Sequence, residues 1–77
     1  KSFVLEDVGE IVRLKLRLPF FENGDFRIEQ FGDELVINIR NNRRNLFLPK
    51  FMGHFVIRDY YYEDPNLVVL FSRITPS

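Results

Sequence analysis

Apolar and polar residues alternate strictly over residues 10–18, and this is the clearest pattern in the chain. One face carries Val12, Leu14, Leu16 and Leu18, and the other carries Arg13, Lys15 and Arg17. Alternation with a period of two is typical of a half-buried antiparallel strand. Pro19 ends this strand because proline has no backbone donor for a sheet ladder.

The same alternation recurs in shorter segments that cover residues 25–30, 35–40, 44–48 and, less cleanly, 55–62. Residues 67–71 are instead a near-continuous apolar segment, which predicts a strand that is buried on both faces or that borders a hydrophobic groove on one of them. Residues 20–24, Gly32-Asp33, Asn41-Asn42 and residues 63–66 are predicted to form loops or turns between strands. No segment has a sustained helical period, and strands spaced about 8–12 residues apart are typical of an all-β sandwich or barrel.

The parity of these strands predicts the core. It contains the same-face residues of the clearest alternations: Leu14, Leu16, Phe26, Ile28, Leu35, Ile37, Leu46, Leu48, Val69 and Phe71. In residues 55–62 the alternation is interrupted at Arg58-Asp59, which predicts a bulge or an edge position.

Composition is that of one small folded domain without covalent cross-links. The chain has 77 residues, 45% of them hydrophobic, no cysteine and a formal net charge of zero. The balanced charge gives no general attraction for nucleic acid or an anionic membrane surface. No apolar run approaches the roughly 20 residues that span a bilayer, so we expect no membrane insertion.

Catalytic motifs are not found in the sequence. The four glycines are isolated from one another, which excludes a phosphate-binding loop, and His54 is the one histidine. We therefore expect no catalytic, cofactor-binding or metal-binding residue in this chain. The basic face of Arg13, Lys15 and Arg17, joined by Arg27, would suit an oligonucleotide-binding barrel, but a solvated strand face explains the same residues better.

Several motifs, in order, resemble those of the α-crystallin or HSP20-like domain. They are Pro19, Gly32-Asp33-Glu34-Leu35-Val36, residues 43–49 (RRNLFLP) and the acidic turn before Leu67-Val68-Val69. The closer similarity is to the HSP20-like domain at the C-terminus of arsenical-pump-driving ATPases, relatives of the ATPase that targets tail-anchored proteins, notably in cyanobacteria and plastids. It covers roughly residues 10–71 and implies an antiparallel, immunoglobulin-like β-sandwich of the HSP20/p23 type.

Two assembly devices of small heat-shock proteins are missing. Asn41-Asn42 leaves no room for a long loop with a swapped strand, and the C-terminal Ile-x-Ile anchor is reduced to Ile74. We therefore expect a monomer or at most a weak dimer. The sandwich is expected over residues 10–72, with residues 1–9 as a linker or short edge strand and residues 73–77 as a flexible tail.

The resemblance implies a non-catalytic accessory domain that contacts an ATPase domain or a hydrophobic client. ATP, magnesium and the phosphate loop would then belong to the parent protein, in the cytoplasm or the plastid stroma. Two alternatives stay open: a free-standing co-chaperone of the p23 type, and the oligonucleotide-binding barrel.

The resemblance also implies a hydrophobic groove beside the last strand. By this resemblance, Val68 and Leu70 would line the groove. Val36 and Phe47, whose parity also places them on an outward face, would line it less directly. Arg43 and Arg44 form a candidate basic surface at the tip of a hairpin. The alternative that the pattern favours is internal capping of this apolar surface by residues 3–5 or by Phe51-Met52, because small monomers rarely leave such patches open.

Overall fold

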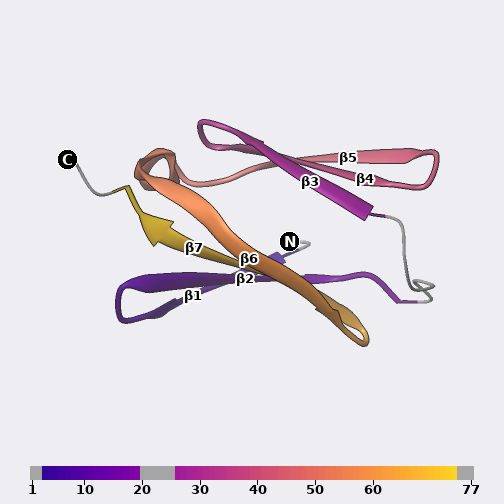
Figure 1. Ribbon diagram of the computed structural model, residues 1–77, viewed down its shortest axis with the longest axis horizontal. Helices are drawn as coiled ribbons and strands as arrows, with labels where there is room; N and C mark the ends of the chain where they lie inside the picture. The colour runs from indigo at the N-terminus through magenta and orange to yellow at the C-terminus, as the bar shows by residue number, and fades with distance from the viewer. Residues whose placement is uncertain (1–2, 20–25, 75–77) are drawn as a thin grey trace. The chain divides into compact units, whose positions relative to one another are not determined.

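The computed structural model describes residues 3–19 and 26–74 and is built almost entirely of antiparallel strands (Figure 1). The elements are β1 (Phe3–Val8), β2 (Ile11–Arg17), β3 (Phe26–Phe31), β4 (Glu34–Ile39), β5 (Asn42–Phe47), the 3-10 turn η1 (Lys50–His54), β6 (Phe55–Glu63) and β7 (Asn66–Arg73). The all-β prediction is confirmed. The predicted loop at residues 20–24 and the end of the predicted tail, residues 75–77, lie outside the described residues.

The strands form two sheets, which belong to two compact units. The four-stranded sheet has the order β1-β2-β7-β6, so the strands at the two ends of the chain are interleaved in it. The three-stranded sheet has the order β3-β4-β5 and is a meander of two hairpins. Residues 3–7 therefore belong to an edge strand that pairs with β2.

Register explains the buried face of the four-stranded sheet. Leu14 lies opposite Val69, and Leu16 lies opposite Leu67. All four of these side chains are almost fully buried. Directly opposite residues of an antiparallel pair project from the same face, so β2 and β7 supply one continuous apolar surface.

The three-stranded sheet is built in the same way. Leu35 of β4 lies opposite Leu46 of β5, while Ile37 lies opposite Ile28 of β3. These residues are buried, as is Leu48 just after β5. Phe47, which lies between Leu46 and Leu48 in the sequence, is 72% exposed, so the predicted parity of this strand is confirmed.

The predicted core is confirmed at nine positions, and the exception is Phe26, which is half-buried at the first position of β3. Burial also extends to residues that the parity pattern placed on the outer faces. The side chains of Val36 and Val68 are each only 1% exposed. Both sit on inner strands of their sheets, where neighbours on both sides can cover a small side chain.

The turn between β4 and β5 differs from the prediction. Ile39 pairs with Asn42, so the two central residues are Arg40 and Asn41, and Asn42 is the first residue of β5. The positive φ of 54° falls on Arg40, not on an asparagine. The predicted turn at Gly32 is confirmed, with a φ of 63° that suits glycine.

Strand β6 is both an edge strand and a bulged one, as its sequence indicates. It pairs with β7 alone, and the register shifts between Ile57 and Asp59. One extra residue on one strand of a pair produces such a shift. The residue between them, Arg58, is exposed.

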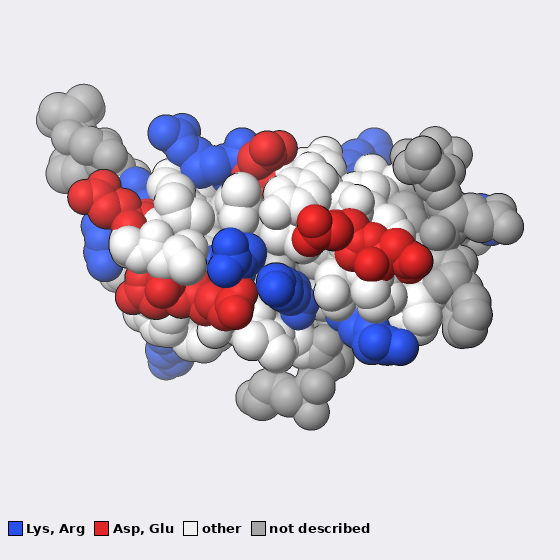
Figure 2. Space-filling view, turned by 90° about the horizontal axis from the view of Figure 1, so that it is seen from below, with Lys and Arg blue, Asp and Glu red and all other residues white. Residues whose placement is uncertain are grey.

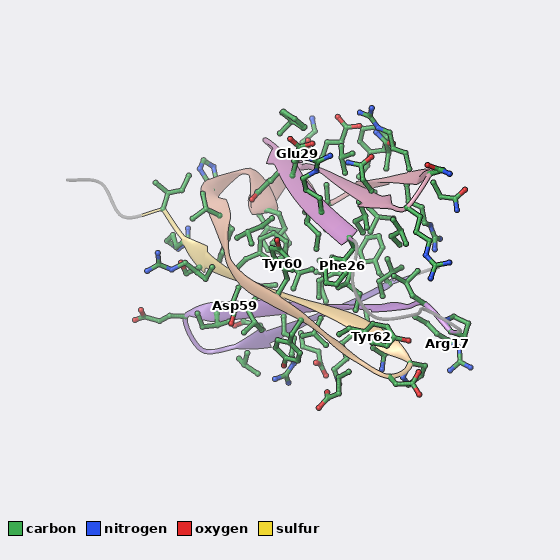
Figure 3. The ribbon with its side chains drawn as sticks, turned by 45° about the vertical axis from the view of Figure 1, so that its right-hand side comes forward. Arg17, Phe26, Glu29, Asp59, Tyr60 and Tyr62 are labelled. Atoms are coloured by element: carbon green, nitrogen blue, oxygen red, sulfur yellow. The ribbon has the colours of Figure 1, made fainter. Side chains whose placement is uncertain are left out.

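A side-chain clasp joins the end of β2 to the β6-β7 hairpin. The Tyr62 hydroxyl donates a hydrogen bond to the Leu18 carbonyl oxygen at 2.7 Å, and Asp64 Oδ1 lies 3.0 Å from the same hydroxyl. The backbone N–H of Leu18 donates to the carbonyl of Pro65 at 2.8 Å. Figure 3 shows Tyr62 near this hairpin and Arg17 near the end of β2.

Residues 50–54 form one 3-10 turn between β5 and β6. The N–H of Met52 donates to the Pro49 carbonyl at 2.9 Å, and the Met52 side chain is fully buried. The N–H of Leu48 donates to the carbonyl of Asp33, which ties the end of β5 to the β3-β4 turn.

Candidate interaction surfaces

The predicted basic face of β2 is partly neutralised by β1. Arg13 Nε donates a hydrogen bond to Glu6 Oε1 at 2.8 Å, and Lys15 Nζ lies 3.9 Å from the same oxygen. The Arg13 hydrogen bond is the main reason that the pKa of Glu6 is lowered, and the Glu6 carboxylate raises the pKa of Arg13. These charges therefore form a local ion-pair cluster.

Two further observations argue against a nucleic-acid surface. Arg27 belongs to the three-stranded sheet, so it does not extend the β2 stripe across one sheet as the sequence suggested. On the face shown in Figure 2, basic and acidic side chains are interspersed with uncharged surface. Neither observation provides the continuous basic track that a polyanion requires.

Val68 and Leu70 share the charged face of the four-stranded sheet. Val68 lies between Lys15 and Tyr61 in the cross-strand register, and Leu70 lies between Arg13 and Asp59. Long amphipathic side chains can cover neighbouring apolar surface with their stems. Val68 is only 1% exposed and Leu70 is half-buried, so of this pair Leu70 offers the greater accessible area.

Internal capping by residues 3–5 is wrong. These residues lie in β1, which extends the sheet beside β2 and does not cross its face. Val4 takes its place in the sheet opposite Lys15, with its side chain 58% exposed. The other proposed cap, Phe51-Met52, belongs to the other compact unit, where Phe51 is 53% exposed and Met52 is buried.

Val36 and Phe47 lie on one face of the three-stranded sheet, as their parity indicated. Val36 is opposite Asn45, two residues before Phe47, and Phe47 is opposite Glu34. Their exposures differ greatly, at 1% and 72%. Phe47 is thus accessible to a partner, whereas Val36 is not.

Arg43 and Arg44 do not form one surface patch. They are consecutive residues inside β5, and consecutive side chains of a strand point to opposite faces. Arg43 lies opposite Asn38, and Arg44 lies opposite Ile37. Both are exposed, but each contributes its charge to a different face.

Phe31 is an accessible aromatic residue that was not among the binding residues predicted from the sequence. It is 58% exposed at the last position of β3. Its parity is that of Arg27 and Glu29, which are also exposed, so the signal was present in the alternation. Figure 3 shows Glu29 and Phe26 on opposite sides of β3, consistent with this parity.

The described residues contain no group of His, Asp and Glu side chains that would hold a metal ion. His54 is exposed at the end of η1. Within residues 3–19 and 26–74, no helix is long and apolar enough to cross a membrane. The fold defines a small all-β domain built of two antiparallel sheets.

Comparison with family models identifies the domain. The model described as the HSP20-like domain found in ArsA matches residues 9–71. The chain belongs to this family, whose HSP20-like domain is a non-catalytic β-sandwich. The oligonucleotide-binding alternative requires a single barrel. It is wrong, because the strands form two separate sheets and the chain belongs to this HSP20-like family. Neither the search of curated proteins nor the search of solved structures gives a match.

Proposed function

We propose that this domain is an accessory interaction module of an ArsA-type ATPase and that it contacts the ATPase domain or a hydrophobic client. The observation that supports the proposal is the family match over residues 9–71. ATP and magnesium would bind to the parent protein outside this chain, in the cytoplasm or the plastid stroma. An HSP20-like sandwich would contribute to such a protein by binding, since the sequence contains no phosphate-loop motif.

The accessible apolar side chains on the two sheets are the proposed contact sites. Leu70 is half-buried on the four-stranded sheet, and Phe47 is exposed on the three-stranded sheet. Val68 would take part only after Lys15 and Tyr61 move aside, because these residues flank it. An Asp substitution at Val68 would bury a carboxylate and destabilise the sheet, so Leu70 is the better position for a test.

The test is a binding measurement between the 77-residue chain and the separately purified ATPase domain of the parent protein. We expect saturable binding by isothermal titration calorimetry, and loss of binding when Leu70→Asp and Phe47→Asp are combined. Ile74→Asp is the matched control, because Ile74 is an exposed apolar residue, 50% exposed, just after β7. The absence of binding by the wild-type chain, both to the ATPase domain and to an unfolded client protein, would refute the proposal.

A further inference from the structure

Two exposed phenylalanines stand at the two ends of one cross-strand row. Phe31 of β3 lies opposite Glu34 of β4, and Glu34 lies opposite Phe47 of β5. Directly opposite residues project from the same face of a sheet, so all three side chains share one face. We call this row, Phe31-Glu34-Phe47, the aromatic row.

The spacing of the row follows from sheet geometry. Neighbouring strands lie about 4.8 Å apart, so Phe31 and Phe47, on either side of β4, have backbones separated by about 10 Å. Their side chains are 58% and 72% exposed. An aromatic side chain buries about 150–250 Å² when it is covered, which makes two of them in one row effective anchors for a partner.

The charge of the row is negative at its centre. Glu34 stands between the two phenylalanines in the register, and its carboxylate accepts a hydrogen bond from Asn45 Nδ2 at 2.7 Å. Glu29, on the same face and next to the row, adds a second carboxylate. The arginines of this face, Arg27 and Arg43, stand two positions further along, opposite Asn38. A partner at the aromatic row therefore meets two apolar groups with negative charge between them.

We propose that the aromatic row binds an amphipathic α-helix that lies across the three strands. This helix carries apolar side chains at positions i and i+7 and a Lys or Arg at i+3 or i+4. Seven residues of helix rise about 10.5 Å, which matches the separation of about 10 Å between the backbones of the two phenylalanines, and all these positions lie on one helical face. The proposal rests on the proposed function and specifies the kind of segment that the module recognises.

An extended peptide fits the row less well. Side chains on one face of a strand are about 6.6 Å or about 13 Å apart, because they recur every second residue with a rise of about 3.3 Å. Neither spacing matches about 10 Å, the separation expected from the strand geometry of the sheet. A second copy of the chain whose two-fold axis passes through the centre of the row would place Glu34 against Glu34, which is repulsive.

The experiment titrates a designed helical peptide into the 77-residue chain. The peptide is an acetylated and amidated Ala-rich helix with Leu at i and i+7 and Lys at i+3 and i+4, and the control peptide carries Glu at the two Lys positions. Binding is followed by fluorescence anisotropy of a labelled peptide and by chemical shifts of the protein. We expect saturable binding of the Lys peptide, shifts centred on β3, β4 and β5, and affinity at least about tenfold lower for the Glu peptide.

Three protein variants test the row itself. Phe31→Ser and Phe47→Ser should each lower the affinity by about tenfold or more. Glu34→Gln keeps an acceptor for Asn45 and should lower both the affinity and its dependence on salt. The matched control is Val4→Ser, because Val4 is also 58% exposed but lies in the other sheet. It should bind like the wild type.

Several results would overturn the inference. They are absence of binding, equal affinity for the Lys and Glu peptides, and an equal loss of affinity in Val4→Ser. A dimer that disappears in Phe47→Ser would assign the row to a second copy, which also overturns the proposal of a helical partner.

If the ATPase domain binds Phe31→Ser and Phe47→Ser as tightly as the wild type while the peptide fails to bind, the inference is wrong and the proposed function stands. If only the peptide binds, with the expected variant pattern, and neither the ATPase domain nor a client does, the proposed function fails.

Discussion

The Tyr62 hydroxyl lies 2.7 Å from the carbonyl oxygen of Leu18, a residue 44 positions away in the sequence. This hydrogen bond joins the end of β2 to the hairpin between β6 and β7. Tyr62→Phe removes this hydroxyl, including its 3.0 Å contact with Asp64 Oδ1, and keeps the ring, so we expect a loss of about 0.5–1.5 kcal/mol in the free energy of unfolding. Urea denaturation measures it, with Tyr61→Phe as the control, since Tyr61 is a neighbouring tyrosine that is 41% exposed. Equal stabilities of the two variants would show that the Tyr62 hydroxyl contributes nothing to stability.

The opposite environments of Leu46 and Phe47 predict opposite responses to truncation. Leu46 is 7% exposed, whereas Phe47 is 72% exposed. Leu46→Ala should therefore lower the free energy of unfolding by about 2–5 kcal/mol, because it leaves a cavity. Phe47→Ala should change it by no more than about 0.5 kcal/mol. Denaturant melts of both variants check the parity of β5, and a loss below about 0.5 kcal/mol for Leu46→Ala would contradict the assigned core.

The ion pair of Glu6 and Arg13 predicts a dependence of stability on pH. The pKa of Glu6 is lowered in the folded chain, mainly by the hydrogen bond from Arg13. A carboxyl group whose pKa falls on folding stabilises the fold at high pH. The contribution is fully present above the ordinary carboxyl value of 4.5 and is lost as the pH falls through the lower folded-state value.

Two measurements test this dependence. The stability difference between wild type and Glu6→Gln should shrink as the pH is lowered below 4.5. In an NMR titration, Arg13→Gln should return the pKa of Glu6 towards its ordinary value. Both side chains are partly exposed to solvent, so high salt should weaken the effect. A Glu6 pKa that is unchanged by Arg13→Gln would show that the hydrogen bond is not its cause.

The short β4-β5 connection predicts a small assembly. Ile39 pairs with Asn42 across a turn with only Arg40 and Asn41 at its centre, which leaves no loop that could be exchanged between copies. We expect sedimentation velocity at tens of micromolar to show a monomer or a weakly associating dimer. A species the size of a dodecamer would contradict this expectation.

Strand positions were predictable because burial of one sheet face forces a period of two on the sequence. The segments at residues 10–18 and 44–48 differ from β2 and β5 by only one or two residues at each end. Such boundary shifts are expected, since strand ends depend on the pairing partner as well as on the local sequence. Arg40 was missed for a related reason, because the register of the hairpin selects the residue with positive φ.

The candidate surfaces were less predictable, because exposure depends on neighbours that one strand does not specify. Val68 has the parity of an outward residue, yet Lys15 and Tyr61 flank it from two other strands. Val36 also has the parity of an outward residue, yet it lies on the central strand of its sheet, between two neighbouring strands. Phe31 could have been found from its parity with Glu29, but its alignment with Phe47 requires the register of both hairpins.

The bulge in β6 has a consequence for how the domain behaves at high concentration. At nine residues β6 is the longest strand described here, and it lies at the edge of its sheet with Val56, Tyr60 and Tyr61 exposed. A long, regular, apolar edge is a template for strand addition and for growth into fibrils. The register shift between Ile57 and Asp59 breaks that template near its middle, and the charged pair Arg58-Asp59 stands at the break. We therefore expect the irregularity to lower the tendency of this edge to aggregate.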